Sequence, residues 1–454
     1  MYSDNCNKSY CMIEQKPFKS ILFFSLPLVF ANLFQQLYSF TDAWIVSEFV
    51  SGYALGSVGS TSSIQFLVIG FCIGFSTGLA IPVSHAFGAK DEAKLYRIIR
   101  NSMLVSLVLS VALAVLFCSL IHPIISILQI QESLSKDAIS YLIIIFAGIP
   151  ATVFYNLAAS VLRAVGNSRS PSLYLFFSLF INLILDLLFV TVFGLGVIGA
   201  ATATVLAQAL CTIICFLKIN KQIVKINEIE FWRKDPSDSI VIKDLISVGI
   251  PMGLQSSITA LGAIIIQRAN NELGDIYSIA FAAGSKIRQV FMCPFDAFAT
   301  GTSVYLAQNI GNRKYERINK GVLAGVFIGV SYGLIAGSVI FVFCSGLTSI
   351  LLDSDLLSWG YCVHYLKCIG ISLWLLGILN VCRMSLQGMK YAKTAMISGV
   401  IELLSRIILT CFFIPVYGYA AVCFNEPFAW VCSSIFVLIA CNVTIRKIRG
   451  KANG

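Results

Sequence analysis

The sequence predicts an all-α membrane protein with twelve transmembrane helices in two six-helix bundles, related by a pseudo-two-fold axis along the membrane normal. Three observations predict this fold class. The 454 residues are 57% hydrophobic and 12% charged, whereas soluble proteins carry about 25% charged residues. Long apolar segments recur along the whole chain, and its two halves repeat one another at a fixed spacing. With a mean hydropathy of +0.85, the chain has too little polar surface for water and fits a bilayer.

Twelve apolar segments are long enough to cross a bilayer, which needs about 20 residues of helix. They cover residues 20–46, 53–84, 98–122, 137–160, 171–193, 196–219, 244–268, 278–307, 319–345, 357–381, 393–415 and 418–445. The polar N-terminus lacks the apolar core and cleavage site of a signal peptide, so we expect the first span to stay in the membrane. The one long polar stretch between spans, "KINKQIVKINEIEFWRKDPSDS", follows the sixth. We therefore predict an N-terminal bundle at 1–219, a cytoplasmic linker at 220–243 and a C-terminal bundle at 244–454.

The two halves repeat with an offset of 224 residues. The matched pairs are Pro27 with Pro251, Tyr141 with Tyr365, Leu162 with Leu386, and Gly194 with Gly418. Because each half has an even number of spans, both halves enter the membrane from the same side, as parallel repeats do. Such repeats are typical of transporters in which one bundle rocks against the other around a site between them.

The distribution of positive charge predicts the orientation in the membrane. With the N-terminus in the cytoplasm, 26 of the 32 Lys and Arg lie in inward-facing segments, Arg383 at the end of the tenth span among them. This positive-inside bias places both termini in the cytoplasm of a multi-pass cell-membrane protein. The net charge of +10 is thereby explained by the membrane, and no nucleic-acid partner is expected.

Polar residues inside the apolar spans of the first half predict a cation site. Asn182 and Asp186 lie one helical turn apart in "SLFINLILDLLFVTVFG" and share a helix face. Asp186 lies nine residues before Leu195, in the turn that follows, and Thr204 lies nine residues after it. In an antiparallel helical hairpin this equal spacing would place Thr204 beside Asp186. Asp42 and Tyr141 fall in the same outer half of the membrane. Two carboxylates, an amide, a hydroxyl and a phenol suit Na⁺ or a proton; a purely structural hydrogen-bond network is the alternative.

The second half does not repeat this set. At the 224-residue offset, Asn182 becomes Arg406 and Asp186 becomes Thr410. Glu402 and Arg406 are four residues apart and predict an ion pair within one helix, which either is structural or lines a cavity.

Three further residues are candidates to line a substrate cavity together with Glu402 and Arg406. They are Gln36, Gln255 and Met292. The chain has no Walker A sequence, no nucleophile–base pair and no metal-ligand spacing, so we expect neither ATP use, nor enzyme activity, nor a cofactor or metal beyond a possible Na⁺.

Several stretches resemble the multidrug and toxic compound extrusion (MATE) family, in its bacterial branch. They are "LPLVFANLFQQLYSFTDAWIVSEFVSGYALGSVG", "LRAVGNSRSP", "INLILDLLF" and "GLGVIGAATATVLAQ". The resemblance implies two six-helix bundles that export organic, mainly cationic and amphipathic compounds in exchange for H⁺ or Na⁺. It also implies the same cation site, Asp42, Tyr141, Asn182, Asp186 and Thr204.

Some members of that family carry acidic residues in the seventh and tenth spans, and this chain has none there, which argues against a coupling site in the second half; whether that half holds an ion or substrate site stays open. A flippase for a lipid-linked precursor or polysaccharide, as in relatives of the wider superfamily, is the alternative function. The expected partners are small organic molecules and the lipid bilayer, and one duplicated chain is expected to work as a monomer. The substrate and the choice between H⁺ and Na⁺ stay open.

Overall fold

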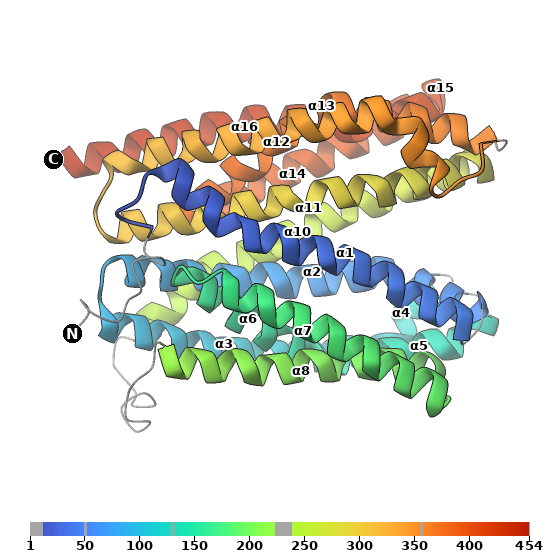
Figure 1. Ribbon diagram of the computed structural model, residues 1–454, viewed down its shortest axis with the longest axis horizontal. Coiled ribbons are helices and arrows are strands. Elements are labelled where there is room, and N and C mark those ends of the chain that lie inside the picture. Colours follow the sequence, from blue (N-terminus) through green and yellow to red (C-terminus); the bar gives the residue numbers. More distant parts are fainter. Residues whose placement is uncertain are drawn as a thin grey trace. The chain divides into compact units, whose positions relative to one another are not determined.

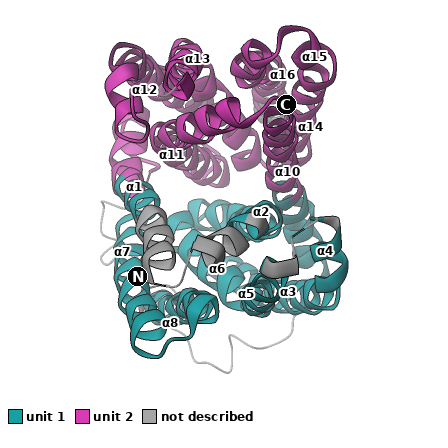
Figure 2. Cartoon of the chain, turned by 90° about the vertical axis from the view of Figure 1, so that its right-hand side faces the viewer, with its two compact units in different colours: residues 1–10, 30–253 teal, residues 11–29, 254–454 magenta. Residues whose placement is uncertain are grey.

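The computed structural model describes residues 12–49, 52–128, 130, 132–222, 238–354 and 357–453. Within these ranges the regular structure is entirely helical, which confirms the predicted all-α class (Figure 1). The chain divides into two compact units (Figure 2). Within the described ranges, unit 1 runs from Phe30 to Gly253, and unit 2 contains the residues up to Val29 and those from Leu254 onward.

The helices of each unit follow the chain order. Two long helices, α1 (Pro17–Phe49) and α10 (Asp238–Glu272), contribute one part to each unit. Unit 1 otherwise contains α2 (Gly52–Gly88), α3 (Glu92–Ser119), α4 (Ile121–Ile127), α5 (Glu132–Ala147), α6 (Ile149–Ala164), α7 (Arg169–Asp186), the π-helix η1 (Leu187–Val192) and α8 (Gly196–Gln222). Unit 2 otherwise contains α11 (Asp275–Gly311), α12 (Glu316–Ser349), α13 (Leu357–Gly388), α14 (Ala392–Ile408), the π-helix η2 (Leu409–Phe413), α15 (Ile414–Tyr417) and α16 (Tyr419–Asn453).

Each of the twelve predicted spans coincides with helix. Ten helical segments are individually long and apolar enough to cross a membrane, and α5 with α6 form an eleventh span that bends by 45°. The bend follows from Pro150, near the start of α6, because a proline cannot donate the backbone hydrogen bond that would continue α5. The remaining predicted span lies in α11, which is 37 residues long but does not meet the same criteria of length and composition.

Backbone geometry supports the repeat read from the sequence. Gly194 and Gly418, 224 residues apart, both have positive φ angles, of 64° and 57°. Each follows a helix with a π-helical turn, η1 in one half and η2 in the other. The two halves therefore share a π-helical turn followed by a glycine with positive φ, which supports the repeat independently of the sequence match.

The units divide α1 and α10 at corresponding places, after Val29 and after Gly253. In unit 2, the first part of α1 packs on α11, where the Ser25 hydroxyl donates to the carbonyl of Ala297 at 3.0 Å. In unit 1, the first part of α10 packs on α2 so closely that a Cβ on Gly78 would lie 2.7 Å from the Cα of Gly249. The domain boundaries predicted from the sequence fall between spans. The contacts in the structure instead place the boundaries of the two units within α1 and within α10.

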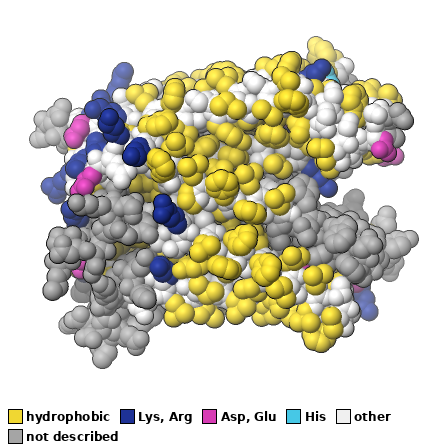
Figure 3. Space-filling view, viewed as in Figure 1, with side chains coloured by type: hydrophobic (Ala, Val, Ile, Leu, Met, Phe, Trp, Pro, Cys, Tyr) yellow, Lys and Arg dark blue, Asp and Glu magenta, His cyan; other side chains and the backbone are white. Residues whose placement is uncertain are grey.

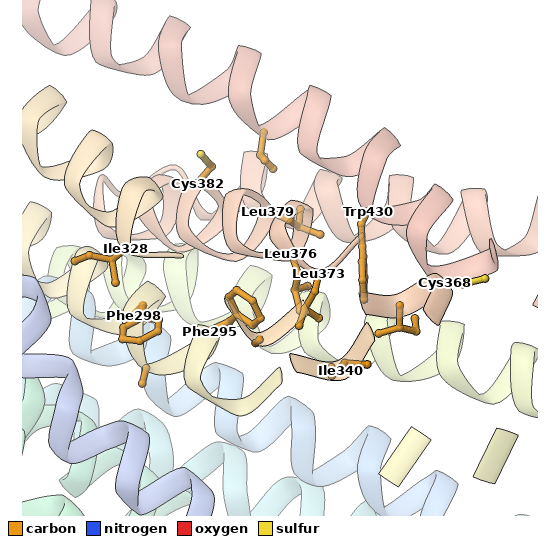
Figure 4. Close-up of a cluster of buried hydrophobic side chains, with 14 of the residues drawn as sticks. Phe295, Phe298, Ile328, Ile340, Cys368, Leu373, Leu376, Leu379, Cys382 and Trp430 are labelled. Carbon is orange, nitrogen blue, oxygen red and sulfur yellow. The ribbon is translucent and has the colours of Figure 1, made fainter. Parts of the chain in front are cut away.

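Apolar side chains fill the interior of each unit and also cover much of the outside. In unit 2, residues such as Phe295, Phe298 and Trp430 form one buried cluster that joins several helices (Figure 4). On the face drawn in Figure 3, hydrophobic side chains cover most of the middle of the surface, while Lys and Arg gather mainly toward the end that carries the C-terminus. A surface of this kind fits a bilayer rather than water.

Glycines let α12 and α13 approach closely. Four of them recur every fourth residue on α12, namely Gly325, Gly329, Gly333 and Gly337. The last three face the α13 backbone, and a Cβ on Gly333 would lie 2.6 Å from the Cα of Trp374. Small residues at this spacing are a recurrent way to pack helices in membranes, where lipid leaves little hydrophobic drive for association.

We expect Gly333→Ala to destabilise unit 2, because the added methyl group would clash with the α13 backbone at Trp374, which cannot shift without moving the helix. Overpacking of this kind costs about 1–3 kcal/mol. The measurement is the thermal unfolding midpoint of the purified protein in detergent. Gly346→Ala, on the same helix but with nothing within 4 Å of the new Cβ, is the matched control and should not lower the midpoint. Equal midpoints for the two variants would contradict the close approach.

Candidate functional site

The predicted pair on α7 is formed. The Asn182 amide Nδ2 donates to Asp186 Oδ2 at 3.0 Å. Both side chains are buried, with exposed fractions of 4% for Asn182 and 0% for Asp186. A carboxylate and an amide in a membrane-spanning helix are costly unless they are satisfied, so their placement favours a functional role.

Asp186 marks the point where α7 changes its geometry. The helix is α-helical up to Asp186, and η1 begins at the next residue. At the end of η1, the amide of the capping residue Phe193 donates to the carbonyl of Leu188, five residues earlier. Single π-turns inside helices occur frequently at functional sites, because the wider turn redirects the side chains around it.

Tyr141 lies on α5 and is buried, with 8% of its surface exposed. Gln65 on α2 approaches its hydroxyl, with 3.5 Å between the Gln65 amide Nε2 and Tyr141 Oη. Gln65 was not among the predicted site residues, although its amide lies within an apolar span and could have been recognised from the sequence.

Thr204 lies on α8, half buried, and its hydroxyl donates to the carbonyl of Ala200 in its own helix at 3.1 Å. Two bonds fix how α7 and α8 run past one another: the Ser178 hydroxyl donates to the carbonyl of Ala207, and Cys211 Sγ to that of Tyr174. This register sets Thr204 near the depth of Asn182, about one helical turn from Asp186.

Asp42 belongs to the helix α1, but its side chain lies outside the described part of the structure. The five-residue cation site as a whole therefore stays a prediction, in which Asn182 and Asp186 are in contact.

In unit 2, the predicted ion pair between Glu402 and Arg406 is confirmed, with 2.7 Å between Glu402 Oε1 and Arg406 Nη2. Arg383 on α13 binds the other carboxylate oxygen at 2.6 Å. All three side chains are buried. Arg383 was counted among the inward-facing basic residues, but its pairing was not predicted: its guanidinium turns into unit 2 and binds Glu402.

Further charges and amides are paired nearby in unit 2. Arg288 on α11 pairs with Glu426 on α16. Asn425 donates through Nδ2 to Thr410 Oγ1 at 3.1 Å, and Thr410 is the residue that matches Asp186. Where unit 1 offers an amide and a carboxylate, the matching positions of unit 2 therefore hold a guanidinium and a hydroxyl, and the carboxylates nearby are already bound by arginines.

The other candidate cavity residues lie in less distinctive surroundings. Gln255 is buried and accepts from Gln387 Nε2 at 2.6 Å. Met292 is partly buried against the core of unit 2, and Gln36 is half buried. The structure brings none of these three into contact with Glu402 or Arg406 through a hydrogen bond among the described side chains.

The comparison with protein families identifies the chain. The MatE family matches residues 27–188 and again residues 251–412. The chain belongs to the MatE family. The two matched ranges begin and end 224 residues apart, which is the spacing of the repeat. It is therefore a multi-span membrane transporter of the MATE type.

Several curated relatives of this MATE protein come from bacteria. It is 28% identical over 312 residues to the probable multidrug resistance protein YpnP of Bacillus subtilis, covering 68% of this chain and 69% of the relative. It is 23% identical over 313 residues to an FAD transporter of Shewanella oneidensis, covering 67% of each. It is 22% identical over 335 residues to the multidrug export protein MepA of Staphylococcus aureus, covering 73% of this chain and 71% of the relative.

Solved structures show the same fold. A crystal structure of MATE in complex with MaL6 matches with a TM-score of 0.88 at 20% identity, over 98% of this chain and 99% of that one. An outward-facing multidrug resistance MATE family transporter of the MOP superfamily matches with a TM-score of 0.87 at 20% identity, over the same shares. The predicted MATE-like, twelve-span fold class is thus confirmed.

Proposed function

We propose that this MATE transporter exports organic, mainly cationic and amphipathic compounds in exchange for H⁺ or Na⁺ by alternating access. The observation that carries the proposal is the buried Asn182–Asp186 pair at the start of η1. A carboxylate with no exposed surface is accessible only to a proton or a small ion, and loading it changes the charge of the span. Relatives with multidrug export in their names support the substrate class.

The rest of the proposal concerns the setting of the transporter. The positive-inside bias supports a cell-membrane protein with both termini in the cytoplasm. The duplicated chain supplies both halves of a pathway, which supports a functional monomer. We propose that it needs no ATP, cofactor or enzyme activity, and that the ion gradient alone drives export.

A flippase would use exposed positive charge to hold a pyrophosphate group. Arg383 and Arg406 are instead buried and both bind Glu402. This pairing leaves neither guanidinium available to a pyrophosphate, which supports the exporter; the exposed basic side chains of the spans in unit 2 include lysines, such as Lys286 on α11 and Lys367 on α13.

The test is transport by the purified protein in proteoliposomes, with ethidium as the cationic probe. A pH gradient and a sodium gradient are imposed separately. We expect one of them to drive ethidium against its concentration gradient, and a protonophore to stop the movement only if the ion is H⁺. Failure of both gradients to move ethidium or tetraphenylphosphonium would overturn the proposal.

A further inference from the structure

The helix α11 carries a polar face that the cation site does not use. Its exposed polar side chains include Lys286, Gln289 and Asp296, with the half-exposed Thr300 one turn further. Their spacings of three, seven and four residues place them on one side of a helix. The opposite side is buried in the core of unit 2, where Figure 4 shows Phe295 and Phe298.

Asp296 lies at the depth of the hydrocarbon. It is 21 residues after the start of α11 and 15 before its end, or roughly 31 Å and 22 Å along the axis, in a bilayer whose apolar core is about 30 Å thick. Its neighbours Phe295 and Ala297 are buried, so this part of the helix is firmly packed. An exposed carboxylate at this depth would be very costly against lipid, so the polar face must border water.

The surroundings of Asp296 leave it able to bind a further group. Asn380 on α13 donates through Nδ2 to Asp296 Oδ1 at 3.2 Å. A carboxylate can accept about four hydrogen bonds, so capacity remains. In the part of the chain that the structure describes, no Lys or Arg forms an ion pair with Asp296; Arg383, whose charge acts on Asp296 from a greater distance, is bound to Glu402. Met292, one turn before it on the helix, offers a flexible apolar side chain that adapts to different shapes.

We propose that Asp296 is the residue that binds the positively charged group of the exported compound, and that the polar face of α11 lines its path. This inference rests on the proposed function, since it names a site for its substrate. Asp186 and Asp296 would then bind cations of different size. Asp186 is fully buried and fits a small ion, whereas Asp296 is open to a bulky organic cation.

Binding of ethidium to the purified protein in lipid nanodiscs, followed by its fluorescence anisotropy, tests the inference. Asp296→Asn keeps the shape and the Asn380 contact but removes the charge. We expect it to raise the Kd for ethidium by about tenfold or more. Asp296→Glu keeps the charge and should recover most of the affinity. Asp275→Asn, at the exposed start of the same helix, is the matched control and should bind as the wild type does.

Three outcomes separate this inference from the proposed function. If the wild type neither binds nor moves ethidium or tetraphenylphosphonium, the proposed substrate class fails. If the wild type moves ethidium under a gradient but Asp296→Asn binds it with unchanged Kd, the substrate site is elsewhere and the inference is overturned. If Asp296→Asn loses its monodisperse gel-filtration peak, the Asp296→Glu variant is used instead. A stable Asp296→Glu protein that binds ethidium weakly would contradict a site that depends on the negative charge.

Discussion

Asp186→Asn is expected to reduce ion-driven efflux to the rate seen without a gradient, while the protein still folds. The substitution is nearly isosteric, and the new amide oxygen can still accept the hydrogen bond from Asn182 Nδ2, now 3.0 Å from Asp186 Oδ2. What is lost is the ability to carry a negative charge at a fully buried position. If this charge holds the coupling ion, a transporter fixed in the neutral state has no way to use the gradient.

The measurement is ethidium movement in proteoliposomes under an imposed gradient, next to ethidium binding to the same preparation. Binding should persist, because the substitution removes the ion site and not the proposed substrate site. Asp137→Asn, an exposed carboxylate on α5 of the same unit, is the matched control and should transport as the wild type does. Undiminished gradient-driven efflux by Asp186→Asn would show that the pair on α7 is structural.

The relations that the sequence predicted correctly are those that depend on spacing within one helix or on the repeat. Asn182 with Asp186, and Glu402 with Arg406, are each four residues apart, which is enough to bring side chains together in any α-helix. The spans themselves depend only on the length of apolar segments, and the repeat on a constant offset. Each of these features depends on residues close together in the sequence or on a constant spacing, so it can be predicted without knowledge of the tertiary contacts.

The features that the sequence missed depend on contacts between helices or on small changes of helix type. Arg383 reaches Glu402 from another helix, and basic residues near the end of a span are more often cytoplasmic. The π-turn after Asp186 could not be predicted from the sequence, because its apolar residues would suit an α-helix equally well. Asp296 was missed because its role depends on which side of α11 is buried, and only the packing of unit 2 shows this.

Glu402→Gln is expected to destabilise unit 2 more than any other single change considered. Glu402 is the shared partner of Arg383 and Arg406, and all three are buried. Neutralising it leaves two guanidinium groups in the interior without their counter-charge. Removing one partner of a buried ion pair typically costs about 3–5 kcal/mol. We therefore expect a clear drop in the thermal unfolding midpoint in detergent and a smaller yield of monodisperse protein.

Two further variants test whether Glu402 is structural or lines the substrate cavity. Glu272→Gln breaks the exposed pair with Arg268, whose side chains are 68% and 84% exposed, and should leave the midpoint unchanged. Replacing Glu402, Arg383 and Arg406 together by Leu and Met should restore much of the lost stability, because apolar residues of similar size often substitute for buried ion networks. If Glu402→Gln instead unfolds as the wild type does but raises the KM for ethidium, Glu402 lines the substrate path, and the arginines hold it in place for binding rather than for stability.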